Sequence, residues 1–254
     1  MLLQCAAWGF PAAVAPDTSD GDMIHPMPLL LLPGLLCDDA LWAPIRPAIA
    51  HLAAPMVADL TQDASLAGMA MRALAQAPPR FALAGLSMGG YVALEILRQA
   101  PERVTRLALL DTSARSDTPE QSRRRRGLIG LARTGQFRGV TPRLLPQLIH
   151  PRHADGPIAT EVLAMAGRVG RDAFLRQQEA ILGRPDSRPM LPGLSLPTLV
   201  AVGAQDILTP PELAEEIAGL LPNAQLRVLP DCGHLSPMES PAIVGALLRE
   251  WLEG

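Results

Sequence analysis

Apolar and polar positions divide the chain into two kinds of segment that alternate from residue 28 onward. Short apolar runs bounded by turn residues predict β-strands at 28–32, 56–59, 81–85, 104–110, 197–203 and 225–229. Longer stretches with apolar residues at helical spacing predict helices at 39–50, 65–76, 87–99, 210–221 and 238–252. Strands that alternate with helices are typical of a parallel sheet with helices on both faces, so the pattern predicts an α/β fold.

One segment breaks this alternation. Residues 114–192 contain no run of β type, only helical stretches interrupted by glycines and prolines. They predict an all-helical insertion of about four short helices between two strands. Insertions at the carboxyl edge of a parallel sheet lie over the place where open α/β folds bind ligands. We therefore expect 114–192 to form a lid over a core made of residues 28–113 and 193–254.

Composition limits the classes of partner. The 254 residues are 48% hydrophobic and 19% charged, which is enough apolar material for one large core. The formal net charge of -3 gives no basic field that would attract nucleic acid. Apolar runs such as Leu29–Leu32 are far shorter than the roughly 20 residues of a membrane span, so no span is expected. Residues 1–27 lack a basic start and contain prolines and aspartates, which predicts a mobile N-terminal extension, or a true start at Met23 or Met27, rather than a signal peptide.

Cysteines and cofactor motifs add two further expectations. Cys5, Cys37 and Cys232 cannot all pair and lack a close metal-binding spacing, which favours a reducing, cytoplasmic location. Cys37 has no basic neighbour that would lower its pKa, so we expect a packed thiol rather than a second nucleophile. No dinucleotide fingerprint, P-loop or zinc-protease motif is present, so neither a metal nor another cofactor is expected.

The strongest chemical signal is the sequence Gly-Leu-Ser-Met-Gly at residues 85–89, which lies between a predicted strand and a predicted helix. In this context the G-x-S-x-G pattern predicts a tight turn that exposes a nucleophilic serine, here Ser87. The glycines permit close backbone contacts that a side chain would block. The N-terminus of the following helix directs free N–H groups toward developing negative charge.

A serine hydroxyl needs a base to remove its proton and an acid to orient that base. His234 follows the last predicted strand, which places it at the same edge of the sheet as Ser87. Asp206 follows strand 197–203, giving the chain order Ser, Asp, His that is expected for this type of hydrolase. Asp111, at the end of strand 104–110, is the alternative acid; it can also reach the histidine from that edge, or cap the turn into the insertion.

Two backbone amides are candidates for an oxyanion hole. One is the N–H of Met88, directly after the nucleophile. The other is the N–H of Leu35, in the loop after the first predicted strand. Together they would stabilise the negative charge of a tetrahedral intermediate.

With these residues assembled, the chain resembles the cofactor-free serine α/β-hydrolases of bacteria, a family that includes carboxylesterases, a pimeloyl-carrier-protein methyl ester esterase and enol-lactonases. The resemblance covers residues 28–254. It rests on Leu29–Gly34, Gly85–Gly90, Gly203–Asp206 and Gly233–Glu239. It implies the α/β-hydrolase fold, a mostly parallel sheet flanked by helices with a helical lid.

The resemblance also implies roles for individual residues: nucleophile, acid and base at Ser87, Asp206 and His234, and oxyanion donors at Leu35 and Met88. Two departures from the family pattern stand out. Most members have His-Gly where this chain has Pro33-Gly34, so the contact made by that histidine is missing. Strands that usually precede the first one found here have only residues 1–27 to form them.

The leading hypothesis is hydrolysis of a small carboxylic ester through an acyl-enzyme intermediate. The same residues fit lactones and thioesters, so the ester preference comes from the resemblance. A second hypothesis is a ligand-sensing module in which a hydrolase-like pocket binds a small molecule with little turnover. The oligomeric state does not follow from the sequence.

Overall fold

The computed structural model describes residues 26–254, and its centre is one six-stranded sheet. All five strand pairs are parallel, in the order β2-β1-β3-β4-β5-β6. The strands are β1 (Met27–Leu32), β2 (Ala53–Val57), β3 (Phe81–Leu86), β4 (Val104–Leu110), β5 (Thr198–Gly203) and β6 (Ala224–Leu229). The predicted parallel α/β sheet is confirmed.

Helices surround the sheet and join its strands. The α-helices are α1 (Arg46–Ile49), α2 (Leu66–Gln76), α3 (Met88–Gln99), α4 (Pro119–Leu131), α5 (Leu145–Leu148), α6 (Pro157–Leu182), α7 (Pro211–Leu220), α8 (Ser236–Glu239) and α9 (Pro241–Glu253). Short helical turns are η1 (Asp39–Leu41), η2 (Ala43–Ile45), η3 (Pro101–Arg103), η4 (Ala132–Gln136), η5 (Pro151–His153) and η6 (Arg188–Gly193).

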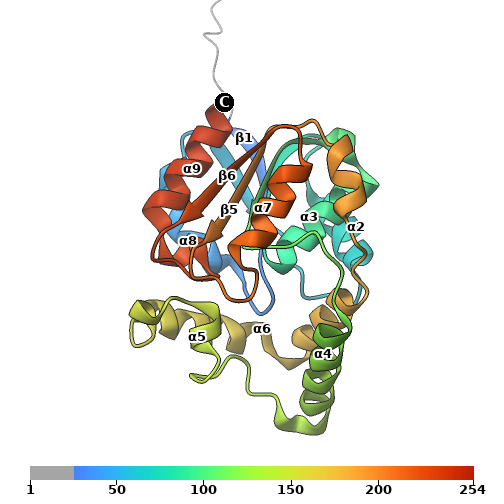
Figure 1. Cartoon of the computed structure of the whole chain (residues 1–254), viewed down its shortest axis with the longest axis vertical. Coiled ribbons are helices and arrows are strands. Elements are labelled where there is room, and N and C mark those ends of the chain that lie inside the picture. The colour runs from blue at the N-terminus through green and yellow to red at the C-terminus, as the bar shows by residue number, and fades with distance from the viewer. Residues whose placement is uncertain (1–25) are drawn as a thin grey trace, which may run out of the picture.

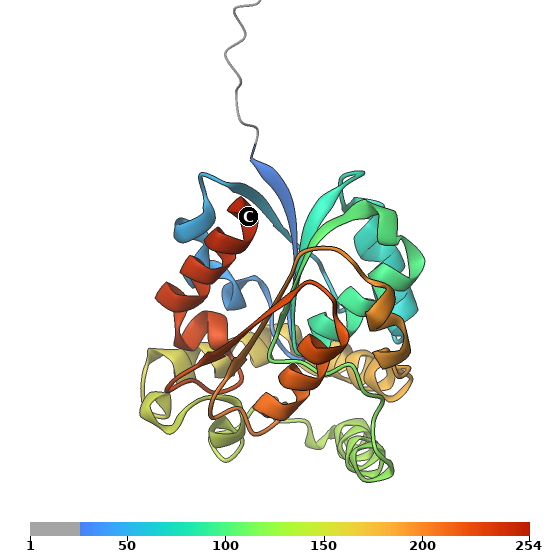
Figure 2. The ribbon, with the colours of Figure 1, turned by 45° about the horizontal axis from the view of Figure 1, so that its top comes forward.

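Alternation along the strands builds two core layers. In β1, Leu30 and Leu32 pack with residues of α2, α3 and α7, whereas Leu29 and Leu31 pack with residues of α1 and α9. Successive side chains of a strand point to opposite faces, so a fully apolar strand requires cover on both sides. Figure 2 shows this cover, with α9 on one side of the sheet and α2, α3 and α7 on the other.

Two predicted elements have different boundaries in the structure. The second strand spans Ala53–Val57 instead of 56–59. It contains Pro55, which is tolerated because β2 is an edge strand and needs hydrogen bonds on one side only. The last predicted helix is divided at Ser240 into α8 and α9, since Pro241 cannot continue a helix that began before it.

The predicted helix 39–50 is wrong as a single element. The structure has η1, η2 and the four-residue α1 in its place. Pro44 and Pro47 each lack the N–H that a continuous helix needs, so the chain proceeds in short turns. Ile45 and Ile49 are nevertheless fully buried, which shows that the apolar spacing marked the inward face correctly.

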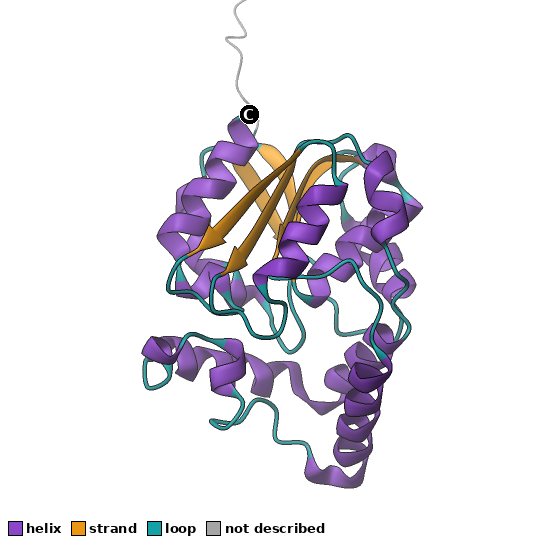
Figure 3. Ribbon diagram, in the orientation of Figure 1, coloured by secondary structure: helices purple, strands orange, loops and turns teal. Residues whose placement is uncertain are grey.

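Between β4 and β5 the chain leaves the sheet and forms the helical inserted segment, residues 114–192, in which no described residue belongs to a strand. Figures 1 and 3 show α4, α5 and α6 together below the carboxyl ends of the strands. The main elements of the segment are the 13-residue α4 and the 26-residue α6, with the short α5 between them. Gly170 lies inside α6 at φ 76°, ψ 178°, outside the helical region, so α6 consists of two helical stretches that meet at a kink.

The predicted N-terminal extension, residues 1–27, lies outside the described residues up to position 25, and β1 already begins at Met27. Within residues 26–254, the structure contains no helix with the length and hydropathy that crossing a membrane requires.

Candidate active site

Ser87 occupies the turn between β3 and α3, in the backbone conformation φ 54°, ψ -114°. A non-glycine residue at positive φ is strained by about 1–3 kcal/mol and persists only when its surroundings hold it. Its N–H donates to Leu110 O (3.0 Å), and its carbonyl accepts from Thr112 Oγ1 (2.7 Å). The end of β4 thus fixes the turn from the neighbouring strand.

The glycines of the turn are required by contact. A Cβ on Gly85 would lie 2.4 Å from Gly89 O, and a Cβ on Gly89 would lie 2.0 Å from Leu32 O. Both distances are far below van der Waals contact. The start of α3 is therefore pressed against the end of β1, and the loop that follows β1 lies beside Ser87.

His234 lies in the loop between β6 and α8, and its Nε2 is 2.9 Å from Ser87 Oγ. The amides on either side of it, Gly233 N and Leu235 N, both donate to the carboxylate of Glu239 at 3.0 Å. The His234 N–H donates to Leu148 O of the inserted segment (3.2 Å). Hydrogen bonds from three successive amides, those of residues 233–235, thus hold the backbone around His234.

Asp206 holds the other side of the imidazole, with Oδ2 2.7 Å from His234 Nδ1. Its Oδ1 accepts from Leu208 N (2.8 Å) and Thr209 N (3.0 Å), and Oδ2 also accepts from the Thr209 hydroxyl (2.7 Å). The structure therefore brings Ser87, His234 and Asp206 into one hydrogen-bonded row.

Burial and charge act in opposite directions on this pair. Burial raises the pKa of Asp206, but the positive charge of His234 and hydrogen bonds from His234 and Thr209 bring it below its ordinary value of 3.8. Burial lowers the pKa of His234, but the Asp206 carboxylate raises it by a larger amount. The pKa of His234 is therefore above its ordinary value of 6.5. The arrangement favours an ionised acid beside a histidine that accepts a proton readily.

Asp111, the alternative acid, makes different contacts. Its carboxylate accepts from Gly203 N (2.9 Å) and from the Ser236 hydroxyl. Among residues 26–254, no hydrogen bond joins it to His234. Burial, followed by repulsion from Asp206, raises the pKa of Asp111 to about 8. Asp111 thus links the start of the Asp206 loop to the segment after His234.

The two expected oxyanion donors face no competing acceptor in residues 26–254: neither Leu35 N–H nor Met88 N–H donates to a protein atom there. Met88 is the first residue of α3, where N–H groups have no partner inside the helix. Leu35 is a central residue of the turn that Cys37 N closes on Gly34 O (3.1 Å). A Cβ on Gly34 would be 3.1 Å from Leu86 Cδ2, which places this turn against the strand that carries Ser87.

Three side chains around the row were not predicted as functional: Thr209, Glu239 and Gln177. Gln177 is fully buried on α6 and accepts from Leu36 N, one residue after Leu35. A polar residue at an inward position of a helix is the sequence signal that could have indicated Gln177.

Cys37 is a buried thiol whose pKa is raised to about 12 by burial and by Asp38.

Comparison with known proteins matches the chain to a family. The family described as alpha/beta hydrolase fold matches residues 61–241. A pimeloyl-[acyl-carrier protein] methyl ester esterase of Neisseria meningitidis serogroup A is 30% identical over 176 residues, covering 67% of this chain and 56% of that relative. The serogroup B protein of the same name is 29% identical over 210 residues, or 80% of each chain.

Solved structures are similar to this chain as well. A thermophilic esterase from Thermogutta terrifontis superposes with a TM-score of 0.80 at 32% identity, covering 89% of both chains. The enol-lactonase from Burkholderia xenovorans LB400 also gives a TM-score of 0.80, at 23% identity, with 92% of this chain and 95% of that one covered. Because the family matches most of the chain, this chain belongs to the α/β-hydrolase fold family.

Proposed function

We propose that this protein is a serine hydrolase that cleaves a small carboxylic ester through an acyl-enzyme intermediate. Ser87 Oγ attacks the ester carbonyl while His234 Nε2 accepts its proton, and His234 then returns that proton to the leaving alcohol. A water molecule, activated by the same histidine, attacks the acyl-enzyme and releases the acid. Asp206 keeps the imidazole in the productive tautomer and stabilises its charged form.

The observation that carries this proposal is the row of two short contacts, 2.9 Å from Ser87 to His234 and 2.7 Å from His234 to Asp206. A nucleophile within reach of a base, which is itself oriented by a third group, is the arrangement that activates a serine. Asp206 fits the role of acid better than Asp111, because Asp111 bonds to Ser236 and a backbone amide instead.

The oxyanion of the intermediate fits between the N–H groups of Leu35 and Met88. The Leu35 amide lies in the loop after β1 and the Met88 amide at the first residue of α3, and neither has a competing acceptor within the described residues. Loss of one such donor typically lowers kcat about 10²–10³-fold, so their placement matters as much as that of the proton-transfer residues.

A carboxylic ester is favoured as substrate because several relatives with about 30% identity are named as esterases. A lactone is an internal ester and would use the same residues, as would a thioester. The natural acyl group is left to experiment. The two buried free thiols, Cys37 and Cys232, fit the cytoplasmic location that we also propose.

The test is a screen of the purified protein against p-nitrophenyl esters of graded chain length, with lactones and thioesters in parallel. We expect repeated turnover of short esters and stoichiometric labelling by an organophosphonate, located at Ser87 by peptide mass spectrometry. Ser87→Ala should lose both, whereas Ser113→Ala, a buried serine outside the row, should keep them. A single turnover without further hydrolysis would favour the ligand-sensing alternative instead.

We further propose that the inserted segment, residues 114–192, is a lid that selects the substrate. Leu145 and Met165 are buried against the core, and Leu148 packs beside them. Alanine at each of these positions should change the preference among ester chain lengths while leaving phosphonate labelling intact. An unchanged chain-length profile in all three folded variants would assign selectivity to the core loops.

A further inference from the structure

Gln177 of α6 makes a contact that spans most of the chain. Its side-chain oxygen accepts from Leu36 N at 3.1 Å, between residues 141 positions apart. Its amide nitrogen donates to Leu60 O at 3.2 Å. The side chain is fully buried, so a lost partner here would leave a polar group without water. Figure 1 shows the loop after β1 reaching down to α6.

Leu36 needs this support because its backbone has φ 59°. It is the third residue of the turn from Gly34 to Cys37, a position where positive φ favours glycine. Leucine at such a position is strained by about 1–3 kcal/mol. Rotation of the Leu35–Leu36 peptide would remove the strain, and it would also turn the Leu36 N–H away from Gln177.

The same peptide is held at its other end and by packing. Leu35 O accepts weakly from Cys37 Sγ at 3.6 Å. The Leu36 side chain packs in a small cluster with Ala132, Ala166 and Phe174, all from the inserted segment. The turn therefore takes its shape from the inserted segment as well as from the core. Pro33 and Gly34, which lead into it, provide no polar side chain of their own.

We propose that Gln177 is a positioning residue that holds the Leu35–Leu36 turn in its strained form and thereby places the Leu35 N–H for the oxyanion. The inference rests on the proposed function, since it assigns a supporting residue to that same site. Gln177 accepts from the N–H of Leu36, whereas the preceding N–H, that of Leu35, has no acceptor among the described residues and is left for the substrate. A displaced donor weakens stabilisation of the intermediate without weakening binding of the ester in its ground state.

Gln177→Met tests this, because methionine keeps the length of the side chain and removes both hydrogen bonds. We expect kcat to fall about 10-fold to 100-fold, with KM within about twofold. The affinity for a trifluoromethyl ketone, which mimics the tetrahedral intermediate, should fall by the same factor as kcat/KM. A second variant, Gln177→Glu, keeps an oxygen acceptor for Leu36 N and should lose less kcat.

The matched control is Gln178→Met. Gln178 is the adjacent buried glutamine of α6, and its side chain accepts from Arg125 Nη1 of α4 at 2.9 Å, away from the loop after β1. Its replacement should lower Tm as much as Gln177→Met does, with kcat and ketone affinity unchanged. That result would separate positioning of the donor from general support of the fold.

Phosphonate labelling separates failure of this inference from failure of the proposed function. We expect wild type and Gln177→Met to label Ser87 to the same final extent, with the variant slower. Wild type that does not label would overturn the proposed function, and this inference with it. Three outcomes would overturn the role of Gln177 alone. The first is that wild type and Gln177→Met label fully at equal rates, and the second is that Gln177→Met and Gln177→Glu lose kcat equally. The third is that activity follows Tm alike in the variants of Gln177 and Gln178.

Discussion

The two sides of the candidate site are supported by different parts of the molecule. On the base side, His234 is bound by Asp206 and its loop by Glu239, and both carboxylates come from loops and helices of the core. On the oxyanion side, the turn that carries Leu35 is held by Gln177, which belongs to the inserted segment. In the mechanism that we propose, proton transfer is therefore supported mainly by the core, and charge stabilisation depends on the insertion.

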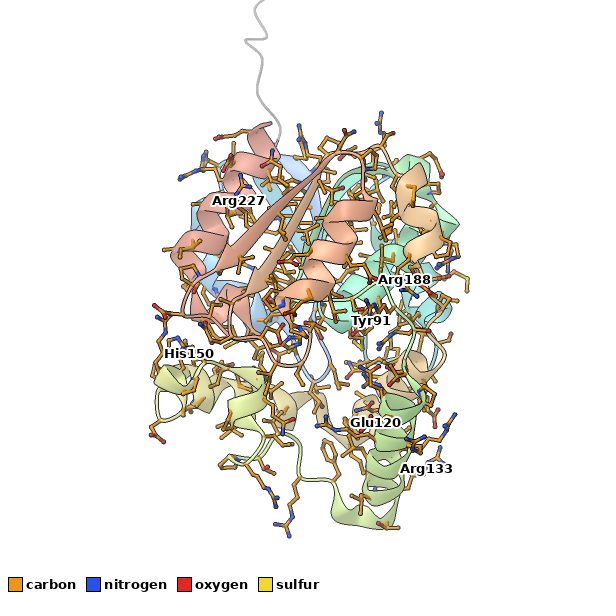
Figure 4. The ribbon with its side chains drawn as sticks, in the orientation of Figure 1. Tyr91, Glu120, Arg133, His150, Arg188 and Arg227 are labelled. Carbon is orange, nitrogen blue, oxygen red and sulfur yellow. The ribbon has the colours of Figure 1, made fainter. Side chains whose placement is uncertain are left out.

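This division has a consequence for how the enzyme responds to its substrate. In the proposed mechanism, a ligand that displaced α6 would change the support of the oxyanion donor, because Gln177 of α6 accepts from Leu36 N. The base side meets the insertion too, through Leu148 O and through His150 N, which donates to Glu239 at 2.7 Å. Figure 4 places His150 on the inserted segment, and Tyr91 of α3 where this segment meets the core. There the Arg184 guanidinium stacks on the Tyr91 ring at 4.2 Å.

The largest expected effect tests the base side. Asp206→Asn should lower kcat about 10⁴-fold, as the corresponding change does in serine proteases, because an amide favours the wrong tautomer of the histidine. The measurement is steady-state hydrolysis of a short p-nitrophenyl ester. Asp111→Asn should lose far less, since Asp111 contacts Ser236 rather than the imidazole. If Asp111→Asn showed the large loss of kcat and Asp206→Asn the small one, Asp111 would be the acid.

A smaller loss is expected from Glu239→Gln. Its carboxylate accepts from three amides, those of Gly233, Leu235 and His150, and a carboxamide can accept through one oxygen only. We expect kcat to fall about 10-fold to 100-fold through displacement of His234. Glu95→Gln is the control, a buried glutamate of α3 that pairs with Arg98. Equal kcat in both variants would show that the loop does not depend on this carboxylate.

Much of the fold could be predicted from local pattern. Apolar runs marked all six strands, and β4 spans 104–110 as expected. The failures arose where local pattern competes with backbone chemistry. Pro44 and Pro47 divided a region with good helical spacing, whereas Gly170 interrupts α6 as its glycine indicated, with a backbone outside the helical region.

The candidate site divides in the same way. Ser87, Asp206 and His234 each follow a strand, and parallel strands bring their carboxyl ends to one edge, so topology alone assembles them. Gln177 and Glu239 could not be found by that logic. Their partners are backbone amides that carry no side-chain signature, and Gln177 is 141 residues from Leu36, whose N–H donates to it.

The pH dependence of stability tests the electrostatics of the buried carboxyl at position 111. Because its pKa is raised from 3.8 to about 8, the folded state retains a proton that the unfolded state releases between those values. Its contribution to stability is therefore present below about pH 4 and is lost as pH rises through about 8. Asparagine does not titrate, so the Tm of Asp111→Asn minus the Tm of wild type should increase by several degrees from pH 5 to pH 9. A constant difference across this range, measured by thermal unfolding, would argue against the raised pKa.

The smallest effect is expected at the second link between α6 and the loop after β1. Arg168 donates to Asp38 through Nε (2.6 Å) and Nη2 (3.1 Å), and also pairs with Glu161. This arginine side chain is 47% exposed, and exposed ion pairs contribute about 0.2–1 kcal/mol and are screened by salt.

Arg168→Gln should therefore lower Tm by no more than about 4 °C at low ionic strength and by less at 0.5 M NaCl, with kcat changed by less than about twofold. The comparison with Gln177→Met is informative because both side chains come from α6 and both hold the loop that follows Leu35. They differ in burial and in what they bind: Gln177 binds a strained backbone amide, whereas Arg168 binds an exposed carboxylate. A kcat loss in Arg168→Gln as large as that in Gln177→Met would mean that general docking of α6, rather than one buried hydrogen bond, sets the position of the oxyanion donor.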